Sequence, residues 1–190
     1  SVKDVHVVSG GGNSKVFKII YACTFKPYCL RPTIYETSFE LIKSLKFLIN
    51  TVDKIDDIKL TIRMRDEEEC TVDSLKLLLP TSNNVVFDNS GTFDDQLMRH
   101  DYLISFSSTT LEEALSYSKP VGTFTSDADY KHLKKTGSSR LIYNLSKENL
   151  ESQLISIKKS VENNVPLRPE DKDKILWKDK QAVNFFDYLS

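Results

Sequence analysis

The stretch from residue 101 to residue 122, DYLISFSSTTLEEALSYSKPVG, joins a short apolar segment to an amphipathic segment through four consecutive hydroxyl residues. Leu111, Ala114 and Leu115 recur at the spacing of one helical face, and the following Lys-Pro dipeptide ends that pattern. The apolar segment before the hydroxyls is short, which is typical of a buried strand. The stretch therefore predicts a strand, a turn and a helix, which together form the repeating unit of a parallel sheet.

Similar segments alternate on both sides of this stretch. Strands are predicted at residues 18–22, 59–65, 84–88, 101–107, 119–124 and 140–145. Helices are predicted at residues 37–52, 75–79, 93–100, 109–118, 150–161 and 182–189, the first beginning with a Thr37–Glu40 capping box. This alternation predicts a three-layer α/β/α, Rossmann-like, doubly wound fold around a mostly parallel six-stranded sheet.

Composition limits the possible partners of the chain. Its 190 residues are 39% hydrophobic, enough for one core, and 26 basic residues nearly balance 27 acidic ones. A net charge of -1 gives no overall attraction to nucleic acid or anionic lipid. No apolar run approaches the roughly 20 residues that span a bilayer, and no signal-peptide pattern is present. We expect a cytoplasmic protein without a transmembrane segment or a nucleic acid partner, and peripheral attachment to the inner face of the membrane stays open.

Residues 1–17 do not fit the strand and helix pattern. Their glycine run, Gly10–Gly12, would have to follow a strand and open a helix to be a dinucleotide-binding loop, whereas the chain enters a strand there. We therefore expect a linker or upstream connector at residues 1–17 and one domain at residues 18–190. The 190 residues are then expected to be one half of a larger protein.

Cysteine and histidine give no sign of a metal site or a nucleophilic triad. The cysteines are odd in number and lack zinc-binding spacing, which favours free thiols in a reducing compartment: Cys23, Cys29 and Cys70. The histidines are scattered singly: His6, His100 and His132. His100 ends a predicted helix, where the helix dipole favours an imidazolium.

The four hydroxyl residues occupy the position where parallel sheets bind ligands, beyond the carboxyl end of a strand. A helix N-terminus there offers unpaired N–H groups, and small hydroxyls add donors, so the site suits an anion such as phosphate. Ordinary capping is the alternative, because Thr109 and Glu112 have capping-box spacing. Four hydroxyls exceed what a cap requires. Glu113 can accept both hydroxyls of a ribose or can be a solvated helix charge.

Other candidate binding residues follow neighbouring strands. Arg63 and Arg65 end the second strand and can clamp phosphate, or can pair with the acids at residues 66–69. The loop after the first strand carries candidate phosphate or acceptor contacts at Thr24, Lys26 and Arg31. The segment after the fifth strand carries Asp127 and Asp129, which can accept sugar hydroxyls, although a solvated turn is favoured for them.

The stretch at residues 101–122 resembles the donor-binding, C-terminal half of GT-B glycosyltransferases and surface-polysaccharide biosynthesis proteins. In that family an Asp-x-Leu-Ile strand leads into a Ser/Thr turn and then into EA…GKPV. The segments YACTF and TIRMR and the aromatic last helix extend the likeness over residues 18–190. The resemblance implies that Ser107, Ser108 and Thr109 hold the phosphate of a nucleotide sugar and that Glu113 holds its ribose. Ser118 departs from the family's glycine before Lys-Pro, and a His-Pro pair after the second strand is absent.

The resemblance implies a glycosyltransferase of surface polysaccharide or glycoconjugate biosynthesis. The nucleotide sugar is its substrate, no separate cofactor or metal is expected, and the catalytic residues are unknown. A missing N-terminal domain would bind the carbohydrate acceptor, so the chain alone would be inactive. Two alternatives stay open: a CDP-glycerol glycerophosphotransferase type of enzyme, and a non-enzymatic module that binds a nucleotide or a partner. The nucleobase, sugar, acceptor and stereochemical outcome carry no sequence signature.

Overall fold

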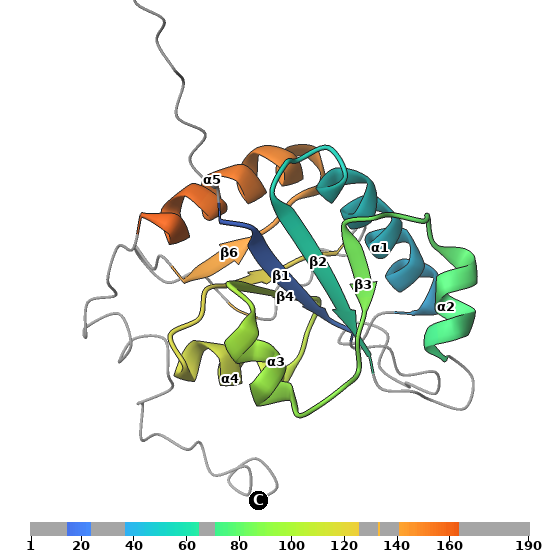
Figure 1. Ribbon diagram of the computed structural model, residues 1–190, viewed down its shortest axis with the longest axis horizontal. Coiled ribbons are helices and arrows are strands. Elements are labelled where there is room, and N and C mark those ends of the chain that lie inside the picture. The colour runs from blue at the N-terminus through green and yellow to red at the C-terminus, as the bar shows by residue number, and fades with distance from the viewer. Residues whose placement is uncertain (1–14, 24–36, 65–70, 126–132, 134–140, 164–190) are drawn as a thin grey trace, which may run out of the picture.

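The computed structural model describes residues 15–23, 37–64, 71–125, 133 and 141–163 (Figure 1). Its strands are β1 (Phe17–Ala22), β2 (Ile58–Arg63), β3 (Val85–Phe87), β4 (Tyr102–Ser105), β5 (Val121–Thr123) and β6 (Ile142–Asn144). All five neighbouring pairs are parallel, in the order β3-β2-β1-β4-β5-β6. The predicted doubly wound, six-stranded sheet is confirmed. Its topological switch point lies between β1 and β4.

Helices cover both faces of the sheet. They are α1 (Ser38–Val52), α2 (Val72–Leu78), α3 (Phe93–Arg99), α4 (Thr109–Ser116) and α5 (Leu150–Glu162), with a 3-10 turn, η1 (Lys147–Asn149), before α5. The α1 and α5 helices lie on one face, and α3 and α4 lie on the other (Figure 1). This arrangement is the predicted three-layer α/β/α fold.

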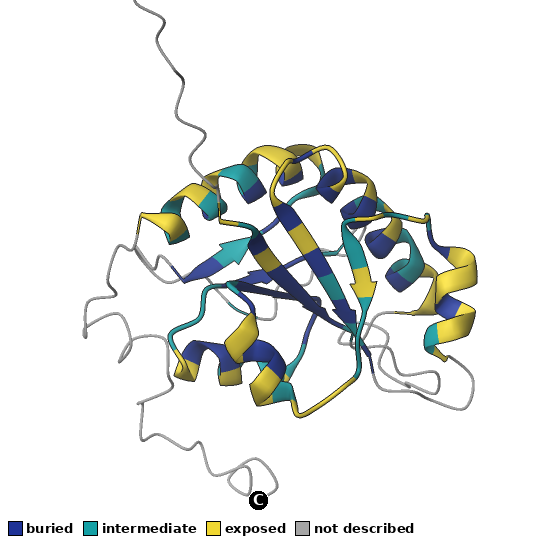
Figure 2. Ribbon diagram, in the orientation of Figure 1, coloured by how far each residue is buried: buried dark blue, intermediate teal, exposed yellow. Residues whose placement is uncertain are grey.

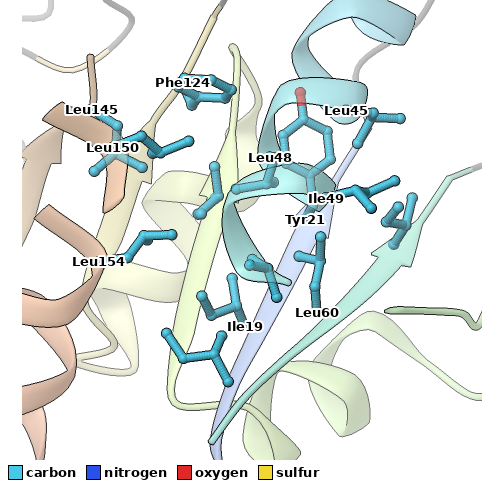
Figure 3. Close-up of a cluster of buried hydrophobic side chains, with 14 of the residues drawn as sticks. Ile19, Tyr21, Leu45, Leu48, Ile49, Leu60, Phe124, Leu145, Leu150 and Leu154 are labelled. Carbon is cyan, nitrogen blue, oxygen red and sulfur yellow. The ribbon is translucent and has the colours of Figure 1, made fainter. Parts of the chain in front are cut away.

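The central strands are buried on both faces, as continuous apolar runs in a parallel sheet require. Alternate residues of β1 enter two clusters. Ile19 packs with side chains of α1 and α5 (Figure 3). Ile20 packs with side chains of α4. Exposed residues gather on the outer faces of the helices, most clearly on α2 (Figure 2). The sheet is thereby fixed between two apolar layers. In open parallel sheets ligands bind beyond the carboxyl ends of the strands, so the candidate site is sought at that edge.

The predicted capping box of α1 is confirmed. The Glu40 N–H donates to Thr37 Oγ1 at 3.3 Å, and the Thr37 N–H donates to Glu40 Oε2 at 2.9 Å. The helix then buries the apolar stripe predicted from its spacing. Local capping and amphipathic spacing agree here, so the sequence specifies where this helix begins.

Two predicted elements end earlier than expected, and two predicted features lie outside the described residues. The second strand ends at Arg63 instead of continuing to residue 65, and Ser118 lies beyond the end of α4. The predicted helix at 182–189 and the glycine run Gly10–Gly12 lie outside the described residues. Within the described residues, no helix has the length and apolar character needed to cross a membrane.

Candidate functional site

The junction between β4 and α4 brings three of the predicted phosphate-binding residues to the carboxyl edge of the sheet, beside the switch point. Ser107 is buried at 4% exposure, Ser108 is half-buried and Thr109 is exposed. The Thr110 N–H donates to Ser108 Oγ at 3.2 Å, so Ser108 is the N-cap of α4. The predicted Thr109–Glu112 capping box is therefore wrong. The extended backbone of Ser108 makes it the N-cap, and Thr109 is already the first helical residue.

Capping leaves donors at this junction available. The Ser108 oxygen accepts from the helix through a lone pair, so its own hydrogen can still be donated. Within the described residues the Thr109 N–H has no hydrogen-bond partner, as is usual in the first turn of a helix. A hydroxyl and a backbone N–H at the positive end of a helix dipole can together hold one anionic oxygen.

The floor of the junction is built by the neighbouring strand. Ser105 Oγ donates to the Ala22 carbonyl at 2.7 Å, which ties the end of β4 to the end of β1. The predicted contacts Thr24, Lys26 and Arg31 follow β1, but they lie outside the described residues. The Ser105 side chain therefore links β4 to β1 at the switch point. Phosphate or acceptor binding by the loop after β1 stays a prediction.

Glu113 is exposed in the second turn of α4. Its predicted contact with a ribose therefore remains compatible with its position and remains untested. Glu112 beside it is half-buried and has contacts of its own.

Arg63 has a structural role that the sequence did not reveal. Its Nη1 donates to the Ser90 carbonyl at 3.1 Å, and its Nη2 donates to the Gly91 carbonyl at 2.9 Å. Gly91 has a φ of 69°, a left-handed conformation that favours glycine, so the β3–α3 loop turns sharply onto Arg63. A phosphate contact for Arg63 stays a prediction, while Arg65 and the acids at residues 66–69 lie outside the described residues.

A network of hydrogen bonds fixes the rest of the β3–α3 loop. Asp88 accepts from the Ser90 N–H at 2.8 Å and from Gln96 Nε2 at 2.7 Å. Hydrogen bonds from Ser90 and then Gln96 lower the pKa of Asp88 to about 2. Asn89 Oδ1 accepts from the Met64 N–H at 3.0 Å. The sequence signal for this loop was DNSG, a run of residues whose side chains typically bond to nearby backbone.

His100 is buried and its pKa is lowered, contrary to the prediction from the helix dipole. Its Nδ1 lies 2.5 Å from the Gln96 carbonyl, which can only accept, so Nδ1 carries the hydrogen. Its Nε2 lies 2.8 Å from Thr61 Oγ1 and accepts from that hydroxyl in the neutral ring. Burial lowers the pKa of His100 and outweighs the carbonyl contact, which acts in the opposite direction.

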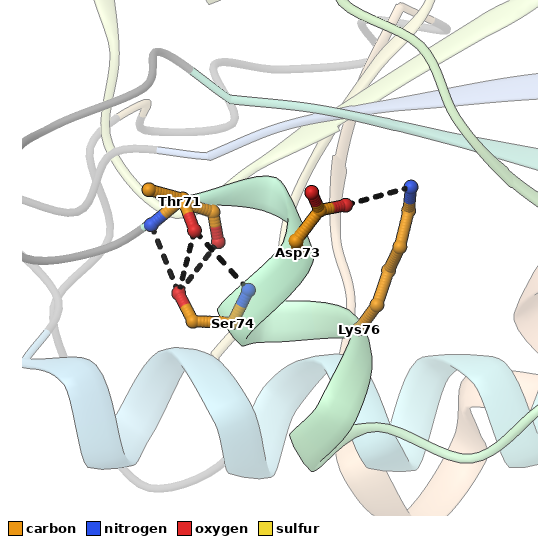
Figure 4. Close-up of polar contacts among 4 residues, drawn as sticks. All are labelled: Thr71, Asp73, Ser74 and Lys76. Atoms are coloured by element: carbon orange, nitrogen blue, oxygen red, sulfur yellow. Dashed lines mark hydrogen bonds and ion pairs between the residues drawn. The ribbon is translucent and has the colours of Figure 1, made fainter.

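The N-terminus of α2 has an ordinary structural cap, which can be compared with the β4–α4 junction. In α2 the Ser74 N–H donates to Thr71 Oγ1 at 3.2 Å, and the Thr71 N–H donates to Ser74 Oγ at 3.0 Å (Figure 4). Asp73 and Lys76 form an exposed ion pair on the same helix (Figure 4). No group of three histidine, cysteine or acidic side chains in the described part of the chain is placed to hold a metal ion.

The ends of β5 and β6 carry a further polar pair. Thr123 Oγ1 donates to Asn144 Oδ1 at 2.8 Å. The predicted sugar-binding residues Asp127 and Asp129 follow β5 and lie outside the described residues. The sequence did not single out Asn144, because the last residue of a short strand has no motif to mark it.

No protein-family model matches the sequence, and no curated protein matches it either. Solved structures do match. The Staphylococcus aureus MnaA–UDP co-structure is 15% identical with a TM-score of 0.52, over 75% of this chain and 36% of that chain. The UDP-GlcNAc 2-epimerase from Neisseria meningitidis bound to UDP-GlcNAc is 15% identical with a TM-score of 0.52, over 82% and 40%. The wall teichoic acid polymerase TagF is 16% identical with a TM-score of 0.50, over 93% and 43%.

The present chain thus spans between 36% and 43% of the length of these similar structures. Identity of 15–16% supports a shared fold and no shared activity. The strand order, the three layers and these matches agree with one another. The chain therefore has the fold of a GT-B-type domain, as its motif at residues 101–122 predicted.

Proposed function

We propose that the chain is the donor-binding, C-terminal part of an enzyme that uses a nucleotide-activated sugar, a glycosyltransferase of surface polysaccharide or glycoconjugate biosynthesis. The observation that carries the proposal is the β4–α4 junction, where Ser108 and the Thr109 N–H lie at a helix N-terminus beside the switch point. Two similar structures are complexes, one with UDP and one with UDP-GlcNAc, which makes uridine nucleotides the first ligands to test.

In this proposal the junction binds a phosphate of the donor. As the bond between the sugar carbon and the phosphate oxygen breaks, negative charge develops on the leaving nucleotide. The Ser108 hydroxyl, the Thr109 N–H and the dipole of α4 stabilise that charge. An acceptor oxygen forms the new bond to the sugar carbon and loses its proton to a base. The acceptor and the base would come from an upstream domain, so the chain alone should bind nucleotide without transferring sugar.

A CDP-polyol transferase is the second candidate, because a wall teichoic acid polymerase is among the similar structures. Both candidates need a phosphate site at the same junction and differ in the group that is transferred. A non-enzymatic nucleotide-binding module would share the site as well. Direct comparison of UDP, UDP-GlcNAc, CDP and CDP-glycerol by titration calorimetry separates the two transferase proposals.

The phosphate site is tested with Ser108→Gly. Glycine is a tolerated N-cap that costs only a few tenths of a kcal/mol relative to serine, so the fold should persist while the hydroxyl is lost. Losing a hydrogen bond to a charged group should weaken UDP binding by about 1.5–3 kcal/mol, roughly 10- to 100-fold in Kd. Thr71→Gly is the matched control, because it removes the N-cap hydroxyl of α2.

Equal affinities in the two variants, or no nucleotide binding by the chain, would contradict the proposed function. The ribose contact has its own comparison, because Glu113→Gln should weaken UDP more than 2′-deoxy-UDP. Glu151→Gln provides the control for that variant, since Glu151 is an exposed glutamate in the first turn of α5.

A further inference from the structure

A row of polar residues crosses the carboxyl ends of three neighbouring strands. Ser105 of β4 pairs in register with Thr123 of β5, and Thr123 pairs with Asn144 of β6. Residues in register on parallel strands share a face of the sheet. Leu103, Val121 and Ile142, two positions earlier on the same strands, all pack in the cluster under α4. The row therefore lies on the α4 side, at the same edge as the β4–α4 junction.

Thr123 fixes the carboxamide of Asn144. The Thr123 hydroxyl is buried at 6% exposure for the residue, and it donates to Asn144 Oδ1 at 2.8 Å. Because the oxygen of the carboxamide faces Thr123, its Nδ2 faces away. Within the described residues this NH2 group has no hydrogen-bond partner. Asn144 thus presents two donors in a set orientation.

The backbone beneath Asn144 is fixed as well. Gln153 of α5 donates from Nε2 to the Asn144 carbonyl at 3.2 Å and accepts from the Ser146 N–H through Oε1 at 2.9 Å. The Leu145 N–H donates to the Thr123 carbonyl at 2.9 Å. One side chain of α5 therefore holds both sides of the turn that follows β6. A donor held in this way loses little conformational entropy when it binds a ligand.

We propose that the Asn144 carboxamide binds a neutral oxygen of the group that is transferred, a sugar hydroxyl or acyl oxygen, and sets specificity there. This inference rests on the proposed function. Asn144 lies two strands from Ser105, about 10 Å at the usual strand spacing. In the proposed function the phosphate lies at the β4–α4 junction and the ribose at Glu113 of α4, so we assign the Asn144 donors on β6 to the part of the donor beyond the phosphates.

The test compares nucleotide sugars with their parent nucleotides by titration calorimetry on the full chain. The probes are UDP-glucose, UDP-galactose, UDP-GlcNAc and CDP-glycerol, each set against UDP or CDP. Asn144→Asp keeps an oxygen for Thr123 and replaces the NH2 donors. It should weaken the best-bound nucleotide sugar roughly 5- to 20-fold while the affinity for the parent nucleotide stays within about twofold.

Matched variants separate a contact from a structural effect. Asn149→Asp makes the same chemical change at an exposed position whose side chain caps nothing, and it should leave both affinities unchanged. Asn144→Ala should reproduce the selective loss without an added charge. Thr123→Val should cause a smaller loss of the same kind by releasing the carboxamide, and Thr123→Ser should restore binding.

Each of the following outcomes would overturn the role proposed for Asn144. Equal weakening of nucleotide sugar and parent nucleotide would mean that Asn144 acts on the phosphates or on the fold, and urea denaturation of each variant reports the second case. Unchanged affinities in Asn144→Asp and Asn144→Ala would remove Asn144 from the site. If UDP and CDP themselves fail to bind the unsubstituted chain, the proposed function fails, and the role of Asn144 fails with it.

Discussion

At the scale of single residues, His100 shows how burial overrides a local rule. A helix C-terminus favours an imidazolium, yet His100 is 7% exposed and its ring is hydrogen-bonded through both nitrogens. Desolvation of the charged form therefore lowers the pKa of His100 below its ordinary value of 6.5. Nearby Lys18 acts in the same direction, whereas Asp101 and Asp88 oppose it.

The shift predicts how stability depends on pH. Because the folded pKa is lowered, the unfolded state binds the proton more readily, and the free energy of unfolding falls as pH drops below about 6.5. Urea denaturation between pH 7.5 and pH 5.5 should show this loss, and His100→Gln should flatten it. Asp88 does not interfere, because its lowered pKa affects stability only below about pH 5. Identical pH slopes in the two proteins would contradict the assignment.

The same scale shows what sequence reasoning could and could not find. The hydroxyl turn at residues 107–109 was visible because its residue types match a function and follow a strand. Arg63 was equally visible, but its carbonyl partners at Ser90 and Gly91 lie 27 and 28 residues away. Spacing along the chain does not encode such partners, because tertiary packing brings them together. Asn144 was missed for the same reason.

At the scale of elements, α4 ends in a turn that normally favours glycine. The Lys119 N–H donates to the Ala114 carbonyl and the Ser118 N–H donates to the Leu115 carbonyl, both at 2.9 Å, the pattern of a Schellman motif. Ser118 has a φ of 60°, in the left-handed region. The departure from the family's glycine at this position therefore leaves a strained serine.

Ser118→Gly should relieve that strain. We expect the free energy of unfolding to rise by about 0.5–1 kcal/mol, because glycine adopts this backbone without a side-chain clash. Ser116→Gly, inside the last turn of the helix, should instead lower stability by a similar amount. Chemical denaturation measures both changes. A loss of stability in Ser118→Gly would argue against the left-handed turn.

The contact between β4 and β5 depends on Gly122. A Cβ built on Gly122 would lie 2.1 Å from the Tyr102 hydroxyl oxygen and 2.9 Å from its Cζ. That hydroxyl is buried and has no hydrogen-bond partner among the described residues. The glycine is therefore required for close packing between the strands, and the hydroxyl contributes nothing that offsets its desolvation.

A double-mutant cycle tests this packing. Gly122→Ala should lower the free energy of unfolding by about 1–3 kcal/mol, as overpacking does. Tyr102→Phe should be neutral or stabilising, and in the double variant it should recover part of the loss. We expect only part of the stability to return in the double variant, because the Cζ atom of residue 102 still lies close to the added Cβ of residue 122. Fully additive effects in thermal or urea denaturation would show that the two side chains do not meet.

At the scale of the whole molecule, the alternation of strands and helices was sufficient to predict the layers and the sheet. The strand order β3-β2-β1-β4-β5-β6 places the switch point between β1 and β4. Helix starts were less predictable: Thr37 was identified correctly, whereas the cap of α4 moved from Thr109 to Ser108. Consecutive hydroxyl residues offer several equivalent caps, and only tertiary packing selects one.

The central claim is that the β4–α4 junction binds the phosphate of a nucleotide. Titrating UDP into the isotope-labelled 190-residue chain while recording backbone amide spectra tests it most directly. The account predicts saturable binding with the largest shift changes at residues 107–113. Absence of binding would contradict it, and so would saturable changes confined to the opposite edge of the sheet, around Asp57 and Asp101.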